Sequence, residues 1–141
     1  EGEVIVRKYS ALGEMTENAS QVADIMQRLA GCPVLVFDRD HVVAVSGAPK
    51  KEFSERRISQ DLEEMMESRR TFLAKSDSDH VRPVEGLTRT ALACMPILTA
   101  GDVTGAVAFL DPADGKLSTP SDLQASLISA ASQFLGKQME A

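Results

Sequence analysis

The sequence predicts an α+β domain in which a central antiparallel sheet of about six strands is flanked by amino-terminal and carboxyl-terminal amphipathic helices. Short apolar runs occur in two pairs, each joined by a few turn residues, which is the pattern of antiparallel hairpins. Helical spacing of apolar residues is strongest near the two ends of the chain rather than between successive strands. A doubly wound fold, in which strands and helices alternate, is therefore not predicted.

The composition narrows the class of protein. A chain of 141 residues suits one domain with a single apolar core. No apolar run approaches the roughly 20 residues that a membrane helix needs, and no signal-peptide pattern is present, so we expect a cytoplasmic protein that does not contact membranes. The formal charge of -6 repels a phosphate backbone, so this chain by itself is not expected to bind DNA.

Residues 4–9 alternate as a strand does, with no segment before them to pair with, so we expect the chain to begin inside a longer protein. After them, apolar residues recur at spacings of three and four and predict a helix of about five turns, which Gly31 and Pro33 end. This apolar seam consists of Leu12, Met15, Ala19, Val22, Met26 and Leu29. Two interpretations are open: the seam packs on the protein's own sheet, or it forms a helix bundle between subunits.

The first hairpin is predicted from two apolar runs at residues 34–37 and 42–45, with Asp38 and Asp40 in the turn between them. A helix with Ser59 as its N-cap follows and ends near residue 70. A strand is expected at residues 71–74, and then an irregular loop with at most a short strand around Val81.

The second hairpin is predicted from apolar segments at residues 90–98 and 103–110, joined by a turn that contains Gly101. These two strands are expected at the centre of the sheet. Thr119 is expected to cap the last helix, with Pro120 in its first turn. The apolar stripe of this helix consists of Leu123, Leu127, Ile128, Ala131, Phe134 and Leu135.

Two segments resemble known families. Residues 95–98 (Met-Pro-Ile-Leu), a short glycine turn and residues 103–109 (Val-Thr-Gly-Ala-Val-Ala-Phe) resemble the closing hairpin of GAF domains. In this hairpin, Gly105 leaves room for a close approach to the sheet. Residues 35–47, followed by Lys50 and Lys51, are similar to the stage V sporulation protein T family.

The opening residues 3–10 resemble the junction in that family between an AbrB-type swapped-hairpin DNA-binding domain and the first GAF helix. The resemblance divides the chain into a residual strand or linker at residues 1–9 and a GAF-like regulatory domain at residues 10–141. It implies a regulator of transcription during sporulation that binds DNA through a domain upstream of Glu1. It further implies a homo-oligomer, for which Leu127 and Phe134 of the last helix join the seam as interface candidates.

The GAF resemblance also implies a small-molecule pocket between the sheet and the segment that connects the two hairpins, although no particular effector or cofactor comes with it. The candidate lining residues are Phe37, Val45, Ser46, Phe53, Ile58, Leu62, Phe72 and Met95. The alternative is that these side chains fill the core. The expected function is thus effector sensing and oligomerisation, and its alternative is a purely structural dimerisation domain whose pocket is filled.

Other chemistry is less well supported by the residue patterns. The cations Lys50, Lys51, Arg56 and Arg57 would attract an anion, but Glu52 and Glu55 offset their field, and a solvated face is favoured. Asp77, Asp79 and His80 lack the ligand spacing of calcium loops and closed zinc sites, so no metal is expected.

Some GAF domains reduce free methionine sulfoxide with cysteine thiols, and this chemistry is a remote alternative for Cys32 and Cys94. The two cysteines form neither a CxxC pair nor a metal cluster and are expected to be reduced, buried and inert. No spacing of a nucleophile and a base is recognisable. We therefore predict that the chain is not an enzyme.

Overall fold

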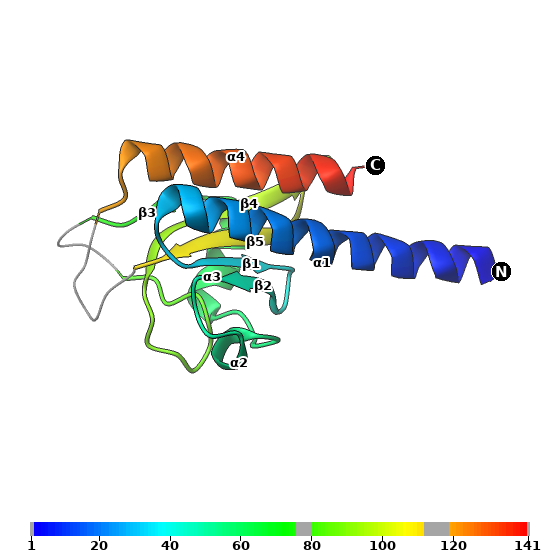
Figure 1. Ribbon diagram of the computed structural model, residues 1–141, viewed down its shortest axis with the longest axis horizontal. Coiled ribbons are helices and arrows are strands. Elements are labelled where there is room, and N and C mark those ends of the chain that lie inside the picture. Colours follow the sequence, from blue (N-terminus) through cyan, green and yellow to red (C-terminus); the bar gives the residue numbers. More distant parts are fainter. Residues whose placement is uncertain (1, 76–79, 112–118, 141) are drawn as a thin grey trace.

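The computed structural model describes residues 2–75, 80–111 and 119–140, with side chains from Thr16 onward. A five-stranded antiparallel sheet carries two long helices on one side, α1 (Gly2–Ala30) and α4 (Asp122–Met139) (Figure 1). Two short helices, α2 (Lys50–Phe53) and α3 (Gln60–Ser68), lie on the other side. This α+β architecture confirms the predicted fold class, with five strands in place of about six.

The sheet has the strand order β2-β1-β5-β4-β3, and all neighbouring strands are antiparallel. The strands are β1 (Val34–Phe37), β2 (Val42–Ser46), β3 (Phe72–Leu73), β4 (Ala91–Thr99) and β5 (Asp102–Leu110). Both predicted hairpins are confirmed. The β4–β5 turn places Ala100 and Gly101 at positive φ, 50° and 88°, which matches the twist of the strands that it joins.

The strand expected at residues 4–9 is wrong, because these residues lie in α1. A strand must pair with a neighbour, and no described strand lies beside this segment, whereas a helix satisfies its backbone hydrogen bonds within itself. Helix α1 ends where the sequence predicted. Gly31 follows it at a φ of 71° and donates its backbone N–H to the carbonyl of Gln27, as a glycine after a helix often does.

The helix caps agree with the predictions for α3 and differ for α4. Ser59 caps α3 by accepting the backbone N–H of Leu62. The N-cap of α4 is Ser121 rather than Thr119, because Ser121 and Gln124 form a reciprocal capping box. Within the described residues, no helix has both the length and the apolar character needed to cross a membrane.

The sheet separates two apolar clusters. On the helix side, residues of α1 and α4 pack against Val34, Val36, Val107 and Phe109. On the opposite side, the alternate residues Leu35, Phe37, Ala106, Ala108 and Leu110 pack against α2, α3 and the segment around Val84. We call the second group the lower cluster. Since strand residues alternate between faces, β1, β2, β4 and β5 each contribute to both clusters.

Candidate functional site

The lower cluster occupies the position where a GAF-type pocket is expected. Six of the eight candidate lining residues belong to it or pack against it: Phe37, Val45, Phe53, Ile58, Leu62 and Phe72. The other two do not join them. Met95 packs in the helix-side cluster, and Ser46 lies opposite Val34 of that cluster, because both stand one residue out of phase with the lower face of their strands.

The centre of the lower cluster is filled by its own side chains. Phe37, Phe53 and Leu62 have no accessible surface, and Val45 and Ile58 have 6% each. A void large enough for a water molecule would leave accessible surface on the side chains around it. The three fully buried side chains therefore line no such void.

Gly105 has a structural explanation. A Cβ atom at this position would overlap the carbonyl oxygen of Phe37 and would lie 3.3 Å from the Cα of Asp38. The predicted close approach to the sheet is thus made by the backbone at the end of β1, since only a residue without a side chain fits there.

Solvent reaches the lower cluster at its margin. A groove of about 380 Å³ lies between α3 and β3, and we call it the α3–β3 groove. Its lining includes Asp61, Met65, Arg70, Phe72, His80 and Val81. Of these, only Phe72 was among the predicted pocket residues; the others come from segments whose spacing does not reveal that they converge. A second groove of about 580 Å³ also borders α3 and shares Glu64 with the first. It is rich in glutamate, with Glu63, Glu67 and Glu85 on its walls.

The four cations that were weighed as anion ligands, Lys50, Lys51, Arg56 and Arg57, are all exposed, as expected for a solvated face. Arg56 donates its Nε to the carbonyl of Glu52, and Arg57 forms an ion pair with Glu85 in which the Nε–Oε2 distance is 3.8 Å. Both partners of this pair are 66% exposed, so it contributes little to stability. A solvated charged face explains these residues.

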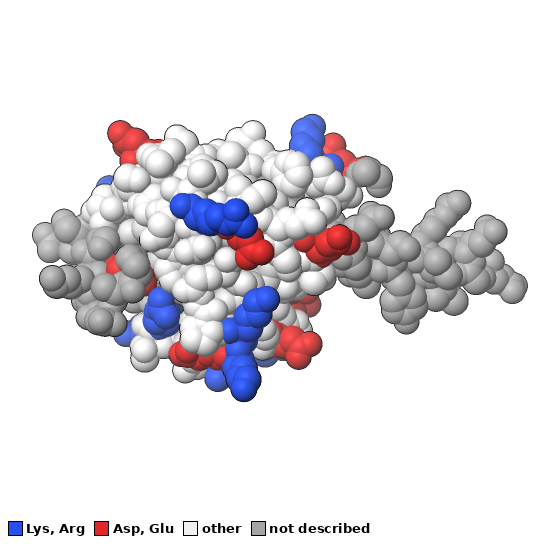
Figure 2. Space-filling view, viewed as in Figure 1, with Lys and Arg blue, Asp and Glu red and all other residues white. Residues whose placement is uncertain are grey.

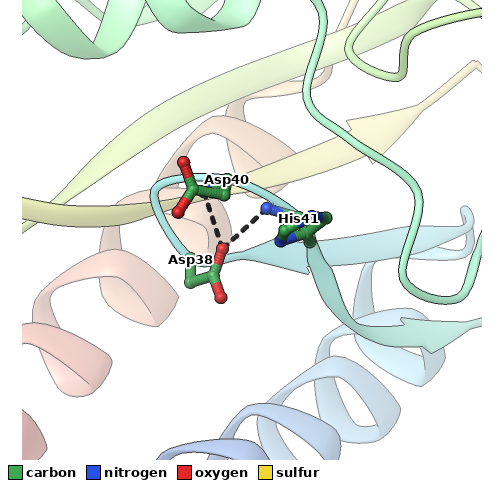
Figure 3. Close-up of side chains that lie close together, drawn as sticks. All are labelled: Asp38, Asp40 and His41. Carbon is green, nitrogen blue, oxygen red and sulfur yellow. Dashed lines mark hydrogen bonds between the residues drawn. The ribbon is translucent and has the colours of Figure 1, made fainter.

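Asp38, Asp40 and His41 lie together at the β1–β2 turn, with one potential ligand atom from each within 4.8 Å of the others (Figure 3). Asp38 Oδ1 accepts the backbone N–H groups of Asp40 and His41, at 2.7 and 2.6 Å. The aspartate therefore closes the turn, as predicted. Asp77 and Asp79 of the other acidic segment lie outside the described residues.

The two cysteines lie on opposite faces of the sheet, Cys32 in the helix-side cluster and Cys94 in the lower cluster. Both are buried, and neither is in a disulfide. Burial raises the pKa of the Cys32 thiol to about 11 and raises the pKa of Cys94 still further. This environment is the reverse of the electropositive, accessible one that activates a thiolate.

We predict that neither thiol reacts readily in the folded protein. At pH 8, the ionised fraction of a thiol whose pKa is about 11 is lower by more than about a hundredfold than that of a thiol with the ordinary pKa of about 8.5. Labelling with a thiol reagent at pH 8 should thus be slower by at least that factor than in guanidinium, where both cysteines are exposed. Native labelling at the unfolded rate would contradict the burial of the cysteines.

The interface candidates of α1 and α4 divide between the core and the surface. Ala19 and Val22 are buried within their own chain, and Met26 and Leu127 are half-buried. Leu29 and Phe134 are exposed, 56% and 49%.

The side chains of Leu12 and Met15 lie outside the described part of the structure. The seam thus serves the internal core over Ala19 and Val22, and Leu29 faces solvent.

Two further apolar side chains of these helices are exposed, Ile25 and Leu123. Sequence reasoning missed Ile25, which stands one residue from the predicted seam, and assigned Leu123 to the apolar stripe of the last helix. We call Ile25, Leu29, Leu123 and Phe134 the helix-layer surface. The surface over the middle of α4 carries few charges (Figure 2), because α4 has no charged residue from Leu123 to Gly136.

Helices α1 and α4 run antiparallel and are joined by hydrogen bonds near both ends of α4. Gln124 donates its side-chain amide to the carbonyl of Ala30 at 2.9 Å, and Asn18 donates to Gln138 at 3.4 Å. Beyond α4, the first half of α1 projects from the body of the domain (Figure 1). Movement of α4 and movement of this projecting helix are therefore physically linked.

Comparison with known proteins agrees with this architecture. Residues 14–140 match the family model for stage V sporulation protein T C-terminal, transcription factor. The chain is 35% identical to stage V sporulation protein T of Bacillus subtilis (strain 168), over 99% of this chain and 77% of that protein. The family resemblance and its assignment to transcription regulation and sporulation are thus confirmed.

Solved structures place the fold among GAF domains. A GAF domain/HD domain protein from Geobacter sulfurreducens superposes with a TM-score of 0.63 at 19% identity, over 93% of this chain and 97% of that one. A type II free methionine-R-sulfoxide reductase from Thermoplasma acidophilum superposes with a TM-score of 0.58 at 12% identity, over 89% and 94%. At such identities the likeness concerns the fold alone, whereas the sequence match shows that the chain belongs to the stage V sporulation protein T C-terminal family of transcription factors.

Proposed function

We propose that this domain is the oligomerising regulatory domain of a cytoplasmic sporulation-type transcription regulator, and that copies associate through the helix-layer surface. The observation that carries the proposal is the composition of α4. A solvated helix ordinarily presents charged residues outward, but α4 has none over 14 residues, Leu123 to Gly136, and exposes Leu123 and Phe134. Exposed apolar side chains of this kind are typical of protein–protein interfaces.

DNA binding is assigned to the amino-terminal part of the full-length regulator. The family is one of transcription factors, the net charge of this chain is -6, and contacts to phosphates require a positive surface. Since α1 leads towards the amino terminus (Figure 1), the packing of α1 and α4 would set the spacing of two attached DNA-binding domains. No catalytic role is proposed, because the burial of both thiols argues against the chemistry named for the Thermoplasma reductase.

The test is the mass in solution of the variant Leu29→Glu/Phe134→Glu. Both side chains are about half exposed, so the two charges should leave the fold intact while placing unpaired carboxylates in the interface. We expect the parent chain to be a dimer or larger and the variant to be a folded monomer, measured by light scattering and circular dichroism.

The matched control is Ser54→Glu/Thr88→Glu, which adds the same charge at two exposed positions outside α1 and α4. It should retain the mass of the parent. A parent chain that is monomeric at high micromolar concentration, or a Leu29→Glu/Phe134→Glu variant that keeps the parent's mass, contradicts the proposed interface.

A filled lower cluster favours the structural form of this function, in which the ancestral pocket is closed by side chains. Sensing of a small molecule is favoured by a different observation, the open α3–β3 groove at the margin of that cluster. The two roles are compatible, because the groove and the helix-layer surface share no residue.

A further inference from the structure

The α3–β3 groove is the place where the lower cluster opens to solvent. Met65 and Val81 each keep 9% of their surface accessible, the highest values among the buried members of that cluster, and Phe72 is half-buried beside them. All three contribute to the lining of the groove. An apolar group placed here would continue the core outward and would remove further apolar surface from water.

The groove also carries charges of both signs and an imidazole. The carboxylates of Asp61 and Glu64 come from α3, the guanidinium of Arg70 from the segment before β3, and the imidazole of His80 from the residue before Val81. Among the described residues, none of these four forms an ion pair within 4.0 Å. Opposite charges therefore share one groove without neutralising each other directly.

Arg70 is partly held in place. Its Nε donates to Ser68 Oγ at 3.2 Å, and its backbone N–H donates to the carbonyl of Met65. Within the described part of the chain, the two terminal nitrogens of its guanidinium have no partner. A guanidinium presented in this way suits a carboxylate, which it contacts through two parallel hydrogen bonds.

We propose that the α3–β3 groove binds a small apolar zwitterion, either a free amino acid or a dipeptide. The ligand's ammonium group is bound by Asp61 and Glu64, its carboxylate by Arg70 with His80, and its apolar side chain packs on Phe72, Met65 and Val81. A volume of about 380 Å³ is within the usual range for small-molecule sites. This proposal deepens the proposed regulatory function and rests on it, since it names the effector class.

The position of the groove connects it to the helix layer. β3 pairs with β4 through Phe72 opposite Cys94, and α4 lies on β4, where Ser132 donates its hydroxyl to the carbonyl of Pro96 at 2.6 Å. A ligand that prefers one position of β3 would therefore bias the position of α4, provided that its affinity differs between the two positions.

The test is isothermal titration calorimetry of this 141-residue chain with L-leucine and with leucyl-leucine. These two probes distinguish a free amino acid from a dipeptide. Two controls each lack one charge, 4-methylpentanoate and 3-methylbutylamine. We expect saturable binding of at least one zwitterion. Each control should bind at least about tenfold more weakly, because it loses one set of charge-assisted hydrogen bonds.

Variants then place the ligand. Arg70→Gln and Asp61→Asn should each weaken binding by about tenfold, whereas Arg57→Gln and Glu63→Gln, in the neighbouring groove, should leave it unchanged. Absence of saturable binding by both zwitterions, or binding that survives both groove variants, overturns the proposal. The association test with Leu29→Glu/Phe134→Glu is independent of this titration: if the parent associates and the variant does not, but the parent binds neither probe, the effector class fails and the oligomerising function stands.

Discussion

Replacing Phe37 with alanine is expected to lower the free energy of unfolding by about 3–5 kcal/mol. The ring has no accessible surface, and it lies in the lower cluster between the sheet and the segments of α2 and α3. Its removal leaves a cavity that the surrounding strands cannot close, because β1 is paired on both sides, with β2 and β5. Urea denaturation of the parent and the variant at one protein concentration measures the loss.

Phe134→Ala is the matched control, since it removes the same ring from a position that is 49% exposed. Its effect on the unfolding of the isolated subunit should be below about 1 kcal/mol, and its main effect should be on association. A loss below about 1 kcal/mol for Phe37→Ala would contradict a filled cluster. It would mean that the side chains around the ring have free space and can move to close the cavity.

Much of the fold follows from local sequence signals that act within a few residues. The two hairpins, the Asp38 turn, the Ser59 cap and the stop at Gly31 each depend on the conformational preferences of one or two residues. The first strand was mispredicted because residues 4–9 alternate as a strand does, whereas pairing with another strand is a long-range condition that alternation does not reveal. Ser121 replaced Thr119 as the cap because only Ser121 stands three residues before Gln124.

The candidate site was harder to predict than the fold. Knowing that Ser46 and Met95 lie in strands does not say which face they occupy. A shift of one residue moves a side chain to the other side of the sheet, and β1–β2 and β4–β5 each contain a register irregularity. The α3–β3 groove brings Asp61, Arg70 and His80 together from three segments, and no spacing in the sequence predicts that convergence.

The two faces of the sheet have different roles in the proposed mechanism. The lower face holds the filled cluster and the groove at its margin, and the helix side of the sheet supports the helices through which we propose that copies associate. Strands β4 and β5 contribute to both. The proposed coupling therefore runs from the groove through the sheet to the helix layer, and it depends on the contact between α4 and β4.

That contact predicts a second large effect, a loss of about 3 kcal/mol in the free energy of unfolding for Gly136→Ala. A Cβ atom at position 136 would overlap the carbonyl oxygen of Leu98, and Ile97 Cγ2 lies 3.7 Å away. The overlapping atom belongs to the backbone of β4 at a residue that pairs with Val103 of β5, so it cannot move without disturbing that strand. In an unconstrained helix the same change would instead stabilise by about 1 kcal/mol.

Urea denaturation shows whether Gly136→Ala lowers or raises the free energy of unfolding. The control is Ser126→Ala, at an exposed position of the same helix, and its free energy of unfolding should stay within about 0.5 kcal/mol of the parent. A Gly136→Ala variant as stable as the parent would show that α4 does not rest on the backbone of β4. If the loss occurs, the surviving folded protein must hold the end of α4 away from β4. Because Phe134 lies half a turn before Gly136 on the same helix, the association of copies should weaken in the same variant. That result would show that the helix-layer surface depends on the contact between α4 and the sheet.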